Sequence, residues 1–157
     1  MKRTLLALTA AFFSMTALAA PTQLTGNQQN NEKHVLSLLA QPISKQKQCA
    51  KLGYIGYQNS LSAVYMTGNH GNRVSPVKAY AWGLVAYHQI LKTNNKKLIN
   101  GQKKTVRFIA KKLRLSKTQK EKAKRLESYF IEKYGHSWPA PSAVMKMKNF
   151  PKPCNLQ

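Results

Sequence analysis

The side chains that carry most enzyme chemistry are scarce in this sequence. It has no aspartate, and its four glutamates are Glu32, Glu121, Glu127 and Glu132. The four histidines lack the H-x-H and H-x-x-x-H spacings that place two metal ligands side by side; they are His34, His70, His88 and His136. No G-x-S-x-G, P-loop or G-x-G-x-x-G motif occurs. We therefore expect a protein that is not an enzyme and that uses no metal or cofactor, and a hydrolase of cell wall or lipid is the weakest alternative.

The N-terminus has the layout of a secretory signal peptide. A Lys-Arg pair at positions 2 and 3 precedes an apolar run over residues 4–18, and Ala-Leu-Ala at 17–19 fits an A-x-A cleavage site. The run is shorter than the ~20 apolar residues of a spanning helix, although an uncleaved anchor is the alternative. We expect residues 1–20 to be removed and the mature protein to be periplasmic or secreted.

Two cysteines, Cys49 and Cys154, belong to the expected mature chain. An even pair in an oxidising compartment indicates one disulfide, and two free buried thiols are the alternative. The bridge would close a loop of about 100 residues, worth ~4–5 kcal/mol in the chain-entropy model. It would also tie back residues 136–157, whose four prolines predict an extended tail.

The net charge restricts the choice of partner. The chain has 26 Lys and Arg against 4 acids, for a formal net charge of +22. Such a surface attracts acidic proteins, anionic cell-envelope polymers and lipid headgroups, while export argues against nucleic acid as the partner. The alternative is a solvated face without a partner. Fourteen of the bases fall within 34 residues: Lys92, Lys96, Lys97, Lys103, Lys104, Arg107, Lys111, Lys112, Arg114, Lys117, Lys120, Lys122, Lys124 and Arg125.

Hydrophobic spacing predicts an all-α domain over residues 41–135, preceded by a flexible linker at 21–40. Apolar spacings of three and four indicate helices at 52–66 and 76–90, and a basic helix around residues 106–113. Ser75-Pro76 is a helix start, and Ser116-Lys117-Thr118-Gln119 is a capping-box sequence that opens a last helix. That helix should end at Gly135 in the left-handed conformation. Its acids should pair with nearby bases, as Glu121 with Arg125.

One stretch resembles a known repeat. Gly53, Leu61, Tyr65, Gly68, Val74, Lys78-Ala79-Tyr80, Trp82 and Leu84-Val85-Ala86 are similar to the Sel-one-like repeat, a helical hairpin related to the tetratricopeptide class. Tyr57 and Ser62 replace small residues of the pattern, and Asn72-Arg73 lengthens its turn. Only one repeat, about 36 residues, is clear. The resemblance implies an α/α repeat with C-terminal capping helices, in which Trp82 is buried between the two repeat helices.

The resemblance also implies a protein-binding role. Bacterial members serve as envelope scaffolds or regulators, and some are immunity proteins or support a secretion system such as type VI. The first repeat helix would line a concave face, where a partner would contact Tyr54, Tyr57, Gln58 and Tyr65, since tyrosine is enriched at binding hot spots. Lys111 and Lys112 would accelerate association. Two alternatives remain: Tyr57 fills space left by a missing neighbouring repeat, or the protein binds an anionic polymer or membrane surface.

Overall fold

The computed structural model describes residues 26–140 and Cys154. The expected signal peptide and the rest of the proline-rich tail lie outside the described residues. Within the described part of the chain, no helix combines the length and the apolar character needed to cross a membrane.

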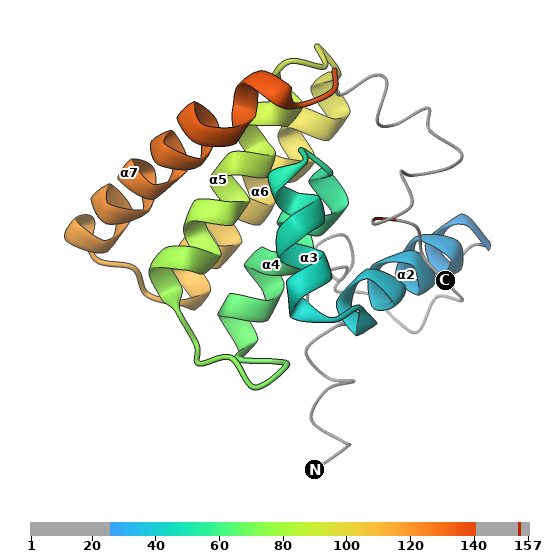
Figure 1. Ribbon diagram of the computed structural model, residues 1–157, viewed down its shortest axis with the longest axis horizontal. Helices are drawn as coiled ribbons and strands as arrows, with labels where there is room; N and C mark the ends of the chain where they lie inside the picture. Colours follow the sequence, from blue (N-terminus) through green and yellow to red (C-terminus); the bar gives the residue numbers. More distant parts are fainter. Residues whose placement is uncertain (1–25, 141–153, 155–157) are drawn as a thin grey trace, which may run out of the picture. The chain divides into compact units, whose positions relative to one another are not determined.

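The described residues form six α-helices and one short 3₁₀ helix, without a β-strand, which confirms the predicted all-α class (Figure 1). The elements are α2 (Gly26–Ala40), α3 (Ile43–Lys51), α4 (Ile55–Thr67), α5 (Pro76–Leu91), α6 (Lys96–Lys112), α7 (Lys117–Tyr134) and η2 (Gly135–Ser137).

The predicted linker at residues 21–40 is wrong for most of its length, because residues 26–40 form α2. The first half of this helix is polar, so it lacks the apolar spacing of three and four residues from which a helix is predicted. Its second half carries Val35, Leu36, Leu38 and Leu39, and Leu38 is buried. The chain divides after Ala40 into two compact units, so α2 belongs to the first unit and all later helices to the second.

Helix α5 is the centre of the second unit. Helices α4, α6 and α7 all pack on α5, and α3 packs on α4 (Figure 1). Small residues permit the close approach: Ser62 Oγ donates to the Ala79 carbonyl at 2.7 Å, and a Cβ on Gly83 would lie 3.0 Å from Ile109 Cδ1. Helices α4 and α5 therefore form the expected hairpin, whereas α6 and α7 both pack on α5 and make few contacts with each other.

The helix ends follow local signals with one exception. Ser116 and Gln119 form the predicted capping box at the start of α7, and Gly68 ends α4 in the left-handed conformation with φ of 75°. Gly135, however, has φ of −66° and leads into the 3₁₀ helix η2, so the predicted left-handed end of α7 is wrong. The chain continues to Trp138, which packs on Gly53: a Cβ added to Gly53 would lie only 2.7 Å from Trp138 Cγ.

The disulfide joins α3 to the C-terminal region. Cys49 and Cys154 are bonded across 105 residues, with Cα atoms 5.7 Å apart. Both cysteines are fully buried, and the Tyr57 hydroxyl donates to the Cys154 carbonyl oxygen at 3.0 Å. The bridge thus places Cys154 against the hairpin that follows Cys49.

Candidate partner-binding surface

The four predicted contact residues, one at the N-cap of α4 and three on the helix, do not form a surface. Tyr54, Tyr57, Gln58 and Tyr65 are 4%, 1%, 0% and 7% exposed, so the predicted concave binding face is wrong. Helix α4 is enclosed by α3 and α5, and Asn59 joins it to α6 by pairing with Gln102 at 2.8 Å. Burial raises the pKa of Tyr54 and of Tyr57. These tyrosines stabilise the fold, as in the alternative in which Tyr57 fills space.

Buried amides, which sequence patterns did not reveal, hold the helices together. Gln58 Nε2 donates to the Ala50 carbonyl at 3.2 Å, Gln89 Nε2 donates to the Gly53 carbonyl at 2.7 Å, and Ser60 Oγ donates to Gln46 Oε1 at 2.7 Å. All three glutamines are almost completely buried. Glutamine at a helical position is usually exposed, so no sequence signal separates these from surface residues.

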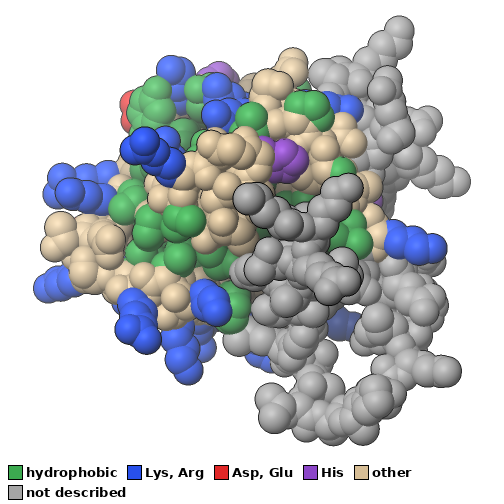
Figure 2. All heavy atoms as spheres, turned by 90° about the horizontal axis from the view of Figure 1, so that it is seen from below, with side chains coloured by type: hydrophobic (Ala, Val, Ile, Leu, Met, Phe, Trp, Pro, Cys, Tyr) green, Lys and Arg blue, Asp and Glu red, His purple; other side chains and the backbone are tan. Residues whose placement is uncertain are grey.

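The basic residues, in contrast, are accessible as expected. Helix α6 has seven Lys and Arg and no acid, and all seven are exposed; they are Lys96, Lys97, Lys103, Lys104, Arg107, Lys111 and Lys112. The helix buries Gln102, Val106 and Ile109 on its opposite side. Figure 2 shows Lys and Arg side chains around one face of the molecule, with apolar side chains between them.

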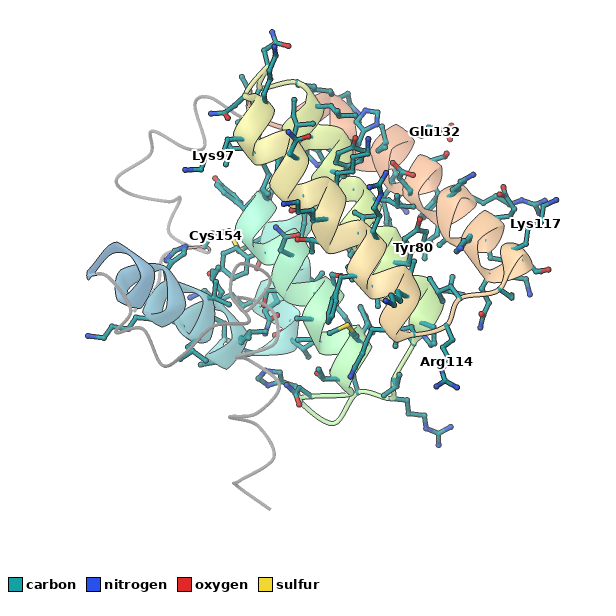
Figure 3. All side chains as sticks on the ribbon, turned by 180° about the vertical axis from the view of Figure 1, so that it is seen from behind. Tyr80, Lys97, Arg114, Lys117, Glu132 and Cys154 are labelled. Atoms are coloured by element: carbon teal, nitrogen blue, oxygen red, sulfur yellow. A yellow bond between two sulfur atoms is a disulfide. The ribbon has the colours of Figure 1, made fainter. Side chains whose placement is uncertain are left out.

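A second accessible feature lies on α5 between its two neighbours. Five large residues there are only half-buried or exposed, and we call them the α5 stripe: Val77, Tyr80, Leu84, Tyr87 and Leu91. Leu91 is 44% exposed. They share one side of the helix, because the steps between them are three or four residues. Figure 3 shows Tyr80 between α6 and α7.

The neighbours of α5 define the two sides of the stripe. On one side, Gly83 faces Val106 and Ile109 of α6. On the other, the His88 Nδ1 atom lies 3.9 Å from Glu127 Oε1 of α7. Lys124 and Glu127 also lie close enough to Tyr80 to act in opposite directions on its pKa, which burial raises. The stripe is therefore an apolar face flanked by two helices rich in cations.

Glu127 is the one α7 acid that is partly buried, with a side chain 18% exposed. Burial raises its pKa, and Lys124 partly opposes that shift. Burial and the charge of Lys92 lower the pKa of His88, so the two side chains are a weak ion pair. The predicted pairing of Glu121 differs in its partner, since Lys124 Nζ lies 3.1 Å from Glu121 Oε1.

Replacement of Glu127 with glutamine should change the pH dependence of stability. The folded carboxyl keeps its proton above the ordinary pKa of 4.5, so its contribution to stability falls as the pH rises from that value through the higher pKa of the folded state. Glutamine resembles the protonated form. At about pH 7 His88, whose pKa lies below 6.5, is neutral in both proteins, and at about pH 4 the carboxyl is largely protonated, so the pair of charges is weak at both ends of the range. We expect the Tm of Glu127→Gln minus that of wild type to increase between about pH 4 and about pH 7. Thermal melts check this, with the exposed Glu132→Gln as control; a constant difference would contradict it.

Within the described residues, no group of three or more His, Cys, Asp or Glu side chains could hold a metal ion. The chain matches no family model, no curated protein and no solved structure.

Proposed function

We propose that this protein is an exported, non-catalytic module that binds another protein through the α5 stripe and the basic helices beside it. The observation that carries the proposal is the stripe itself. Large apolar side chains that remain accessible side by side, with charges around them, are typical of protein-binding sites.

The disulfide and the N-terminal sequence support export. A structural disulfide is typical of oxidising compartments, and the bond between Cys49 and Cys154 is compatible with such a location. The signal-peptide layout at residues 1–20 would provide the route of export. A periplasmic or secreted location is the simplest account of both.

The α4–α5 hairpin supports kinship with the Sel-one-like repeat family. The hairpin spans all but the first of the residues on which the resemblance rests, and its turn contains the left-handed Gly68 and Gly71. A role as envelope scaffold, regulator or immunity-type protein, linked to a secretion system, would follow from that kinship. The separation of α6 from α7 departs from a stack of closed hairpins.

Binding to an anionic envelope polymer or lipid headgroup is the second candidate function. Helix α6 favours this function, because it has seven exposed cations and no acid. Such binding would be dominated by charge and would not use the apolar stripe.

Salt distinguishes the two functions. Mature protein would first be crosslinked in periplasmic extract to capture a partner. The binding of any captured protein would then be measured while the salt concentration is raised from about 0.1 M to about 1 M. This increase shortens the Debye length from ~10 Å to ~3 Å and so screens charge–charge attraction. A protein complex that weakens but persists supports the proposal. Binding only to anionic vesicles or polymer, with complete loss at high salt, would refute it.

A further inference from the structure

The α5 stripe has the spacing of a coiled-coil seam. From Val77 to Tyr80, Leu84, Tyr87 and Leu91 the steps are three, four, three and four residues. This is the a/d repeat with which one helix packs along another. The stripe spans fifteen residues of helix, which at a rise of ~1.5 Å per residue puts its two ends about 21 Å apart. A single further helix is the element that matches this row in both spacing and length.

The helices beside the stripe, α6 and α7, favour one sign of charge on that further helix. On the α6 side, every charged residue from Lys96 to Lys112 is basic and exposed. On the α7 side, six bases outnumber three acids, and Glu127 is already placed beside His88 and near Lys124. Residues that border a coiled-coil seam choose partners by charge. The incoming helix should therefore carry acids beside its apolar row.

We propose that the α5 stripe binds an acidic amphipathic helix of another protein, laid along α5 between α6 and α7. The proposal rests on the proposed protein-binding function and names its partner chemistry. The parts of this chain outside the described residues contain no acid, since all four glutamates lie elsewhere. A second copy would bring its own cations against those of the first. Neither of these occupants complements the charge.

A defined peptide tests the proposal directly. The probe is a fluorescent synthetic helix with leucines at alternating steps of three and four and glutamates on both sides. Fluorescence anisotropy would measure its Kd for the mature protein. The first control peptide has the same composition with leucines scrambled off one face, and the second is poly-glutamate. Wild type should bind the probe at least about tenfold more tightly than either control, ~1.4 kcal/mol.

Matched protein variants locate the site. Leu91→Glu places a charge at the exposed end of the stripe, and Leu52→Glu makes the same change at a leucine of similar exposure, 39%, outside it. Leu91→Glu should weaken probe binding by more than about tenfold, because the seam would bury an unpaired carboxylate near the acidic probe. Leu52→Glu should change the Kd less than about twofold. Leu84→Ala, which removes apolar contact without charge, should also weaken binding, and circular dichroism at the assay temperature would check that the variant is folded.

The outcomes separate this proposal from the proposed function. If Leu91→Glu and Leu52→Glu lose equal affinity for the probe, or if Leu91→Glu loses none, the binding site lies away from the stripe. If a captured natural partner loses affinity for Leu91→Glu while the probe does not bind, the proposed function stands and the acidic helix falls. If that partner binds Leu91→Glu normally, the stripe is not the binding surface and both fall. If poly-glutamate or anionic vesicles bind as tightly as the probe, both fall in favour of a charge-driven surface. If neither control peptide competes, and Leu91→Glu and Leu84→Ala are defective while Leu52→Glu binds normally, both stand.

Discussion

Replacement of Trp82 with alanine is expected to lower the free energy of unfolding by about 3–5 kcal/mol. Trp82 is 4% exposed, and its ring stacks on Phe130 with centroids 4.4 Å apart and planes 19° from parallel. The ring therefore joins α5 to α7, a contact beyond the two repeat helices between which the resemblance placed it. A loss of this size is a large part of the stability of a small domain. Chemical denaturation monitored by circular dichroism measures it.

The stacking partner gives an internal control. Phe130→Ala should destabilise the fold as well, and the double variant should lose less than the sum of the single losses, since aromatic pairs contribute ~0.5–1.5 kcal/mol beyond area burial. Tyr129→Ala, a neighbouring aromatic side chain that is 47% exposed, should cost less than about 0.5 kcal/mol. A Trp82→Ala protein with wild-type stability and defective binding would show that Trp82 contacts the partner instead.

Helix starts were predictable because their signals are local. Proline at the first position of α5 and the Ser116–Gln119 capping box specify where two helices begin, and the structure places them there. The end of α7 was not predictable in this way. Gly135 permits the left-handed conformation, yet the chain runs on to pack Trp138 against Gly53, which is 85 residues earlier and invisible to a local pattern.

The burial of the α4 tyrosines also depends on distant contacts. Tyr57 is covered in part by Cys154, 97 residues away, and α4 is joined to α6 through Asn59 and Gln102, 43 residues apart. A tyrosine on an isolated hairpin would be accessible, which is why the sequence suggested a binding face. Only the packing of the later elements decides that these side chains belong to the core.

The α5 stripe is the opposite case, in which side chains that the sequence pattern would bury are accessible. Apolar residues occur all round α5, and a helix of that kind is expected to be buried on every side. The heptad steps from Val77 to Leu91 can be read in the sequence, but the sequence does not show that α6 and α7 leave this row accessible. That result depends on both helices packing on α5 with little contact between them.

Removal of the disulfide is expected to have an effect comparable to the loss of Trp82. The bridge between Cys49 and Cys154 closes a loop of 105 residues, which the chain-entropy model equates with about 4–5 kcal/mol of stability. The double variant Cys49→Ser/Cys154→Ser removes the bond without leaving a free thiol. Its Tm should fall well below that of the oxidised wild type, as measured by thermal melting under identical conditions.

A reductant separates the cross-link from the serine substitutions. Reduced wild type should melt near the double variant, while the reductant should leave the variant unchanged, because only wild type has a bond to break. Tyr57→Phe tests the contact beside the bridge: it removes the hydrogen bond to the Cys154 carbonyl and should cost about 0.5–1.5 kcal/mol, much less than the bridge. Full reaction of unreduced, denatured protein with a thiol reagent would show that the cysteines are free. The large loss on serine substitution would then have to arise from core packing alone, since both side chains are completely buried.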